Sequence, residues 1–451
     1  MNYREALIYF RDRSDYERGF VSNPFAGDEA AATGLRRTRL LLDQLGSPDR
    51  AYPIIHVAGT KGKGSTCAFI ESMTRHCGLR TGLFATPQLH SVRERTLIDA
   101  QPISEAQFAE TLGRVAAAVE QVERAHPEAG ILTAFEISTA QSLLAFAEAG
   151  VDLAVVEVGM GGRLDATNVV HPAVTVITPV SFDHQAILGD TLSKIAGEKA
   201  GIIKPGIPVI AAQQDSEATA TIIAIANRHD APVLLAGRDW SSDWRDGLTT
   251  LSGPWGRIAG VRLGLEGPHQ ALNAGTAMKA LWRFNRNLFA DHARLRAGLE
   301  SVSWPGRFEQ IADSPPVIVD GAHNAASIQV LVEALRHEFP GCPATVILGS
   351  YRDKDLSGML AALRPLSPAL ITTRSASLRA RDPDEIAATA REQGFDVTTA
   401  PTVAAALDLA TERVAPSGVI VATGSFSVVA EARDHLGLAT ISPDEREILS
   451  S

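Results

Sequence analysis

A short glycine-rich segment, GTKGKGS at residues 59–65, has the residue types and spacing of a phosphate-binding loop. It follows an apolar, strand-like run at 54–58 and leads into a helix-like segment at 63–77. In such a turn the main-chain N–H groups face an anion, and the helix dipole adds to the attraction. A lysine in the loop would reach the terminal phosphates as a point charge. We therefore expect a nucleotide site rather than an ordinary strand-to-helix turn, formed by Gly59, Thr60, Lys61, Gly62, Lys63, Gly64 and Ser65.

The loop departs from the common pattern at one position. The usual phosphate-binding loop places Ser or Thr directly after the lysine, where the hydroxyl binds Mg²⁺. Here Gly64 separates Lys63 from Ser65 and Thr66. If Mg²⁺ binds, its hydroxyl ligand must come from Ser65 or from elsewhere in the chain.

Four further side chains with suitable chemistry lie at or after the ends of strand-like or helix-like runs. Glu157 lies at the end of the apolar run 152–158, and Asp183 with His184 follows the next run. Side chains at the carboxyl ends of parallel strands point into the crevice where ligands bind, and a carboxylate is a hard oxygen ligand for Mg²⁺. Lys199 is expected just after a helix, where a lysine is usually a surface residue. The alternatives are a solvated glutamate and a structural histidine.

The elements that position these residues alternate along the chain. Apolar strand-like runs occur at 53–58, 80–85, 152–158, 172–178 and 207–212, with helical periodicity at 63–77, 104–124 and 134–149. This alternation is typical of an α/β fold in which helices cover both faces of a mostly parallel sheet. Residues 238–266 instead combine tryptophans, glycines and short alternating runs, which indicates a small antiparallel insert.

A second α/β unit begins after a break. The Pro-Gly pair in SVSWPGRFE places a boundary near residues 300–306. Beyond it, strand-like runs again alternate with helix-like segments. We predict a P-loop-type domain at 1–300 and a smaller, doubly wound, Rossmann-like domain at 301–451, whose strands lie within 316–324, 344–350, 369–373, 395–400 and 418–424.

Composition restricts the partners and the compartment. A length of 451 residues suggests two domains, and a net charge of −10 disfavours broad binding to nucleic acid or anionic membranes. The three cysteines show no CxxC spacing, which is typical of free thiols in a reducing compartment. No run of 18 apolar residues occurs, and the charged N-terminal segment has no apolar core of a signal peptide. We expect a cytoplasmic protein with no nucleic-acid or membrane partner.

Several separate motifs together resemble the folylpolyglutamate synthase and dihydrofolate synthase family, within the Mur ligase superfamily. They occur in the order found in that family. They read HVAGTKGKGSTC, TPQLHSVRERTL, FEISTAQSLLAF, EVGMGGRLDATNV, DHQAILGDTLSKIAGEKAGIIKPG, GPHQALNAGTA, WPGRFE and DGAHN.

The resemblance implies an ATP-dependent ligase that joins L-glutamate to a folate or dihydropteroate carboxylate through an acyl phosphate. It implies catalytic roles for Lys63, His184 and Lys199, and two Mg²⁺ ions. The metal ligands would be Thr86, Glu157, His184 and Lys199, with Lys199 carried as a carbamate; Thr86 would then supply the missing hydroxyl. Further ATP contacts are implied for Asn273, Arg307 and Asp320, and substrate contacts for Asp165, on the pterin side, and His323. We expect a monomer.

Two departures and several alternatives stay open. Gln88 stands where the family usually has a histidine, and residues 232–266 match nothing recognisable in it. The acceptor within the family is also open among dihydropteroate, folates and polyglutamylated folates. The competing functions are another Mur-type amide ligase with a different acceptor, and a nucleotide-binding protein without catalysis.

Overall fold

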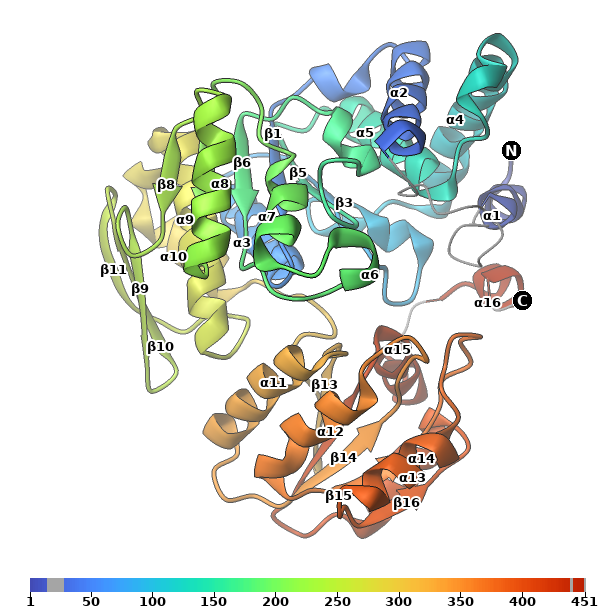
Figure 1. Cartoon of the computed structure of the whole chain (residues 1–451), viewed down its shortest axis with the longest axis vertical. Coiled ribbons are helices and arrows are strands. Elements are labelled where there is room, and N and C mark those ends of the chain that lie inside the picture. Colours follow the sequence, from blue (N-terminus) through green and yellow to red (C-terminus); the bar gives the residue numbers. More distant parts are fainter. Residues whose placement is uncertain (14–27, 439–440, 450–451) are drawn as a thin grey trace.

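The larger of two α/β units surrounds an eight-stranded sheet (Figure 1). The structure is a computed structural model that describes residues 1–13, 28–438 and 441–449. The sheet has the order β4-β3-β2-β5-β1-β6-β7-β8; β3 and β4 are antiparallel at one edge and the other strands pair in parallel. Its strands are β1 (Ile54–Ala58), β2 (Thr81–Phe84), β3 (Thr96–Ile98), β4 (Gln101–Pro102), β5 (Leu153–Glu157), β6 (Val174–Ile177), β7 (Val209–Ala211) and β8 (Val233–Leu235).

Helices cover both faces of this sheet, as the alternation of elements predicts. Because successive strand residues point to opposite faces, Ile55 packs in one core and its neighbour Ile54 in another. Helices α3 (Lys63–His76), α9 (Pro268–Phe284) and α10 (His292–Glu300) line the first core. The second core lies under α1 (Tyr3–Asp12), α2 (Asp28–Gln44), α4 (Glu105–Ala125) and α5 (Ala134–Ala149). A third group of helices covers β6 and β7 and consists of α6 (Gln185–Leu188), α7 (Leu192–Ala200) and α8 (Ser216–Arg228).

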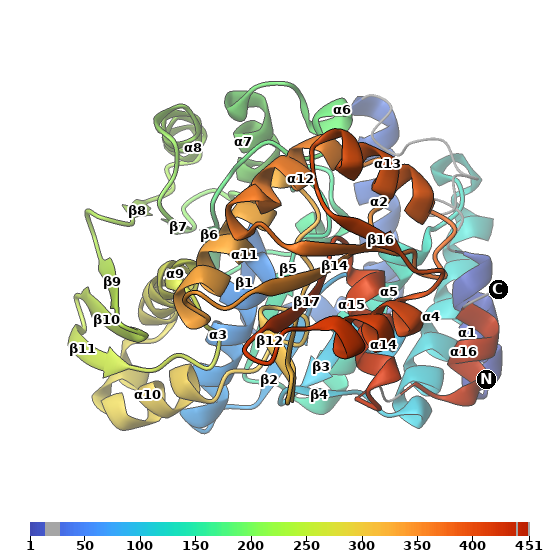
Figure 2. The same ribbon diagram turned by 90° about the horizontal axis from the view of Figure 1, so that it is seen from below.

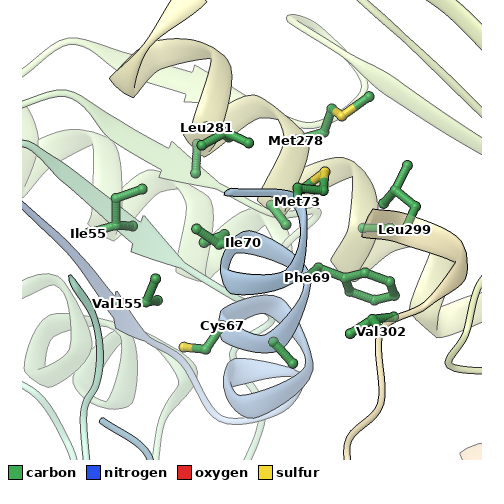
Figure 3. Packing of buried hydrophobic residues seen from close by; sticks show 14 of the residues in the cluster. Ile55, Cys67, Phe69, Ile70, Met73, Val155, Met278, Leu281, Leu299 and Val302 are labelled. Carbon is green, nitrogen blue, oxygen red and sulfur yellow. The ribbon is translucent and has the colours of Figure 1, made fainter. Parts of the chain in front are cut away.

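The helix that follows the glycine-rich loop is buried on almost all sides. Figure 3 shows Phe69, Ile70 and Met73 of α3 packed between the sheet and the helices α9 and α10. Cys67 on the same helix is buried, and all three cysteines are free thiols. A helix held by apolar contacts on both sides gives the loop at its N-terminus a fixed position.

The antiparallel insert is confirmed. It forms a three-stranded sheet of order β11-β10-β9, with β9 (Ser241–Arg245), β10 (Leu248–Gly253) and β11 (Gly256–Val261). Leu251 and Trp255 of the insert join the core around α9. Gly275 of α9 allows close approach, because a Cβ there would lie 2.0 Å from the Ser242 hydroxyl.

The smaller unit contains a six-stranded sheet of order β12-β13-β17-β14-β15-β16. All its strand pairs are parallel except that of β12 with β13. β12 is an edge strand that the sequence pattern did not predict. Helices α11 (Ala325–Glu338), α12 (Leu356–Leu363) and α13 (Pro383–Glu392) cover one face, and α14 (Val403–Arg413) and α15 (Phe426–His435) the other. The strands are β12 (Glu309–Asp313), β13 (Pro316–Asp320), β14 (Ala344–Leu348), β15 (Ala369–Thr372), β16 (Val397–Thr399) and β17 (Val419–Thr423). The expected mostly parallel sheet and smaller doubly wound unit are both present.

The last helix returns to the larger unit. Helix α16 (Pro443–Leu449) lies beside α1, so the two ends of the described chain are neighbours (Figures 1 and 2). Ile448 enters the core around α1, and Arg4 pairs with Asp444 at 2.7 Å. Residues 443–449 therefore contact the first unit although they follow the second; the domain ranges 1–300 and 301–451 stay predictions. No helix in the described ranges is long and apolar enough to cross a membrane.

Candidate active site

The glycine-rich loop joins β1 to the N-terminus of α3. Gly62 is the N-cap and has a φ of 78°, a left-handed conformation that favours glycine. A Cβ at Gly62 would lie 2.3 Å from Oδ1 of Asn273, so α9 packs directly against the loop. The N–H groups of Thr60 and Lys61 donate to the carbonyl of Pro179 at 3.0 and 3.2 Å. An anion at this loop would therefore meet the first-turn N–H groups of α3, which have no partner within the helix.

Glu157 faces the lysine of this loop. Its carboxylate lies 3.9 Å from the Lys63 ammonium, and the main-chain N–H of Thr86 donates to it at 3.4 Å. Glu157 is 5% exposed, which excludes the solvated-glutamate alternative. Burial raises the pKa of Glu157, and Lys63 and then Arg307 oppose that rise. A buried carboxylate with one distant ion pair and one long hydrogen bond is suited to receiving a cation.

Lys199 is buried beside the same loop. It lies in the last turn of α7, so the expectation that it follows a helix is wrong: the helical hydrogen bonds continue to Ala200. Its side chain is 4% exposed and donates a hydrogen bond to the carbonyl of Gly59 at 2.9 Å. Burial, helped by the Lys63 charge, lowers the pKa of Lys199 to about 7. This is not the surface lysine of the alternative reading.

Asp183 and His184 follow β6 on the same side of the sheet. His184 has a left-handed φ of 48°, and its N–H donates to Asp183 at 2.9 Å. Burial lowers the pKa of His184, Asp183 opposes this, and three lysines lower it further: Lys354, Lys199 and Lys63. The loop after β6 thus brings an imidazole and a carboxylate into the electrostatic field of the phosphate loop.

The linker and the second unit supply an arginine and a carboxylate. Asp320, at the end of β13, accepts hydrogen bonds from the N–H groups of Phe308 and Ala322, both at 2.8 Å. The Arg307 guanidinium lies over the Phe426 ring, 4.4 Å from its centroid. Burial lowers the pKa of Arg307, and the charges of Asp320 and Glu157 oppose that change. Arg307 therefore lies within the field of a carboxylate from each unit.

His323 and Lys354 extend this region. The Nδ1–H of His323 donates to the Gly321 carbonyl at 2.8 Å, which leaves Nε2 as the atom able to contact a ligand. Lys354 is a charged residue that the sequence pattern did not indicate; its side chain is 13% exposed, and its ammonium lies 3.6 Å from the Asp353 carboxylate. Its charge reaches His184, Asp183 and His323. The only sequence signal was its place after β14, at the carboxyl edge of the second sheet.

The carboxylate of Asp165 accepts hydrogen bonds from neighbouring residues of the chain. It caps the short turn Ala166–Val169 and accepts hydrogen bonds from Met160 N–H and from both the N–H and the hydroxyl of Thr167. Burial raises its pKa. The ring of Phe135 packs against the backbone beside it, since a Cβ at Gly159 would lie 2.6 Å from that ring. A substrate contact for Asp165 stays a prediction; its observed contacts shape the loop.

Asn273 and Gln88 lie next to the loops that carry the other site residues. Asn273 on α9 donates to Gln270 at 2.9 Å and points its Oδ1 at the phosphate loop. Gln88, which replaces the histidine usual in the family, accepts a hydrogen bond from Arg95 Nε at 2.7 Å. Gln88 thus braces the segment that carries Thr86.

The donor set fits Mg²⁺ bound together with a nucleotide. The described ranges contain no group of three or more His, Cys, Asp or Glu residues that could hold a metal by itself. Mg²⁺ is usually held by one or two carboxylates together with substrate phosphates and water. One buried carboxylate, Glu157, next to the Thr86 segment and facing Lys63, matches that requirement.

Comparison with known proteins agrees with this geometry. The Mur ligase middle domain model matches residues 57–281, and the Mur ligase glutamate ligase domain model matches residues 306–426. The dihydrofolate synthase/folylpolyglutamate synthase of Mycobacterium tuberculosis is 37% identical over 439 residues, covering 89% of this chain and 90% of the relative. The Bacillus subtilis protein of the same name is 37% identical over 355 residues, covering 75% of this chain and 80% of its own.

Solved structures show the same fold. Mycobacterium tuberculosis folylpolyglutamate synthase complexed with ADP and AMPPCP superposes with a TM-score of 0.85 at 36% identity, covering 90% of this chain and 96% of that one. E. coli FolC in complex with DHPP and ADP superposes with a TM-score of 0.84 at 27% identity, covering 97% and 98%. With both Mur ligase models matched and near-complete coverage of these relatives, the chain belongs to the folylpolyglutamate synthase and dihydrofolate synthase family of Mur ligases.

Proposed function

We propose that this protein is an ATP-dependent ligase that joins L-glutamate to the carboxylate of a folate or of dihydropteroate. The observation that carries the proposal is the set of half-buried Lys63 and buried Glu157 and Lys199 around the glycine-rich loop, facing Arg307 and Asp320 from the linker and second unit. The names of the similar proteins support the reaction, and ADP, AMPPCP and DHPP in the similar structures support the substrates.

The reaction must first activate a carboxylate, because O⁻ is a poor leaving group for an amine. The acceptor carboxylate attacks the γ-phosphorus of ATP, ADP leaves, and an acyl phosphate forms. The amine of glutamate then attacks the acyl carbon, inorganic phosphate leaves, and the amine proton passes to solvent or base. Several anions meet during these steps. Lys63 and Arg307 offset their repulsion, and burial strengthens both interactions.

Thr86 and Glu157 would hold one Mg²⁺ with the nucleotide phosphates, and His184 with Lys199 would hold a second. Mg²⁺ held there would supply charge neutralisation to the nucleotide phosphates. For Lys199 to serve as a ligand, its neutral amine adds to CO₂, an N–C bond forms and a proton is lost, which gives a carbamate anion. The lowered pKa of Lys199, about 7, supports this because it leaves much of the amine neutral near physiological pH.

The remaining residues are placed for the two organic substrates. His323 and Lys354 form a cationic or hydrogen-bonding region on the second unit, opposite Asp183, suited to the carboxylates of glutamate. The Phe135 ring beside Asp165 offers a flat apolar surface next to a carboxylate, suited to a pterin ring. Asn273, which contacts the phosphate loop, is placed for ATP.

The test is incorporation of labelled glutamate, with ATP and Mg²⁺, into dihydropteroate and into tetrahydrofolate offered separately. We expect ATP-dependent incorporation with at least one of them and one ADP released per amide formed. UDP-muramyl acceptors serve as the control for other Mur-type ligases, and incorporation only with those would contradict the proposal. ADP release that is independent of glutamate and of every acceptor would favour a nucleotide-binding protein without ligase activity.

A further inference from the structure

The segment that carries Thr86 is fixed by hydrogen bonds along its length. The Glu94 carboxylate accepts the N–H groups of Leu89 at 2.8 Å and Ser91 at 3.0 Å. Gln88 is held by Arg95 at 2.7 Å. A loop whose main-chain donors converge on one carboxylate has few alternative conformations, so its position is set by whatever anchors its far end.

That anchor comes from the last described helix. Glu445 on α16 is 2% exposed and accepts two hydrogen bonds at 2.9 Å, from the Ser91 hydroxyl and from the N–H of Val92. Ser91 is the N-cap of the short turn Val92–Arg95 that follows the loop. The Tyr3 hydroxyl of α1 lies within the field of the same carboxylate, which after burial contributes to raising the pKa of Tyr3. Glu445 is thus enclosed between α1 and the turn.

A second contact joins the loop to α15. Arg433 donates to His90 Nε2 at 3.1 Å and also pairs with Glu309 of β12. Arg446 of α16 in turn pairs with Asp434 of α15. The second unit therefore reaches the loop directly, through Arg433, and indirectly, through α16. We name Arg433 and Glu445 the C-terminal clasp.

We propose that Glu445 is a positioning residue that fixes the 86–92 segment through Ser91 and Val92 and thereby sets the place of Thr86 at the nucleotide-bound metal. Through Arg433 the clasp also joins this segment to α15, so a shift of the second unit would be transmitted to the segment that carries Thr86. The proposal rests on the proposed function for the role of Thr86, whereas the effect on the loop itself does not depend on any activity.

The first experiment measures amide hydrogen exchange in the nucleotide-free protein for peptides covering residues 86–95. Glu445→Ala removes the oxygen that accepts from the Ser91 hydroxyl and from the Val92 N–H, and we expect exchange of this segment to become at least about tenfold faster, since the buried Val92 N–H loses its acceptor. Glu447→Ala is the matched control on the same helix: its carboxylate is 66% exposed and pairs with Arg4 rather than with the loop. We expect the control to leave exchange at 86–95 unchanged. Equal exchange in the two variants would overturn the proposal.

The second experiment measures the Mg²⁺ concentration that gives half-maximal ligase rate. Groups that orient a metal ligand typically change metal affinity by roughly 10- to 100-fold, so we expect Glu445→Ala to raise this concentration by about tenfold with little change in the KM for glutamate. Should Glu445→Ala fail to fold, Ser91→Ala removes one donor from the loop side and should produce the same shift, smaller in size. An unchanged Mg²⁺ requirement in an active Glu445→Ala or Ser91→Ala enzyme would overturn the proposal. A wild-type protein without any ligation would instead refute the proposed function, and the exchange experiment would still decide the clasp.

Discussion

The side-chain nitrogen of Lys199 donates a hydrogen bond to the main-chain oxygen of Gly59 at 2.9 Å, although 140 residues separate the two in sequence. The contact brings the end of α7 to the start of the phosphate loop. An ammonium buried at this point, beside the Lys63 charge, is costly, and the pKa of Lys199 falls to about 7. The amine is therefore poised between its charged and neutral forms near physiological pH.

The first prediction concerns the pH dependence of carbamate formation at Lys199. After exposure to low pH without CO₂, we expect activity to be lost and to return when CO₂ is restored. At constant dissolved CO₂ the recovery rate should rise with pH and level off above about pH 7, because the neutral fraction of the amine increases as pH passes its folded pKa. Carbon-13 NMR of the carbamate checks the species. A rate that still climbs tenfold per pH unit above pH 8 would indicate an ordinary lysine and contradict this prediction.

Replacing the lysine gives the second prediction. Lys199→Ala should lower the ligase rate by at least about 100-fold, since the proposed metal ligand is lost. Short carboxylates such as acetate should restore part of the rate by supplying oxygen ligands. Lys194→Ala on the same helix, where the side chain is 63% exposed, is the matched control and should keep wild-type activity. A fully active Lys199→Ala enzyme would remove the carbamate from the mechanism.

The third prediction separates two glycines with the same backbone conformation. Gly62 and Gly206 both have φ near 70–80°, but a Cβ at Gly206 meets nothing within 4 Å whereas one at Gly62 would lie 2.3 Å from Asn273. Each change to alanine should cost about 1 kcal/mol of stability from backbone strain. Only Gly62→Ala should also weaken ADP binding, by at least about tenfold, because the loop and α9 must separate. Equal ADP affinity in the two variants, measured by calorimetry, would show that the loop does not bind the nucleotide.

The fourth prediction is that replacing Glu157 raises the stability of the protein but lowers its ligase activity. Its pKa is raised by burial, so its ionised form opposes folding, and this cost is fully present at pH values above the folded pKa. Glu157→Gln should therefore raise the melting temperature of the ligand-free protein by about 1 °C at pH 7, with the gain disappearing as pH falls below the unfolded pKa. The same variant should lose ligase activity by at least about 100-fold. A variant that is less stable at pH 7 would show that Lys63 and Arg307 overcompensate for the burial.

The fifth prediction concerns the loop lysine. Lys63→Ala should abolish amide formation, because the β- and γ-phosphates lose a cation of the loop itself. It should also raise the pKa of Glu157 further, since Lys63 is the largest factor that lowers it. Incorporation of labelled glutamate gives the first readout, and Lys194→Ala is again the control. Near-wild-type turnover in Lys63→Ala would refute the placement of ATP at this loop.

The sequence predicted the elements that have a strong periodic pattern. The runs that became β1, β5 and β17 are mostly apolar and buried along their whole length because both faces of a parallel sheet are covered. The strands it missed are β3, β4, β8 and β12, which lie at or next to a sheet edge. Three of them, β3, β4 and β8, are only two or three residues long and carry too few residues for any period to appear.

Site residues divided in the same way. Those adjacent to a strand end, such as Glu157 and Asp320, could be expected at the crevice because the end of a parallel strand fixes where they point. Lys354 could not, since one lysine in a charged loop gives no signal until the second unit brings it opposite Asp183. The burial of Lys199 also depends on packing between segments far apart in sequence, which no local pattern encodes. The bond between Glu445 and Ser91 is the extreme case.

That bond also bears on how the protein is made. A ribosome adds Glu445 354 residues after Ser91. At about 5–20 residues per second, the segment around Thr86 waits roughly 20–70 s for its buried acceptor. The first sheet is complete at β8 and the helices packed on α3 are complete at α10, both long before then, so a nascent chain can hold a folded glycine-rich loop while the Thr86 segment still lacks the Glu445 acceptor. With the proposed role of Glu445, synthesis order separates folding of the glycine-rich loop from fixing of the Thr86 segment, and we expect chains cut short before α16 to retain the former without the latter.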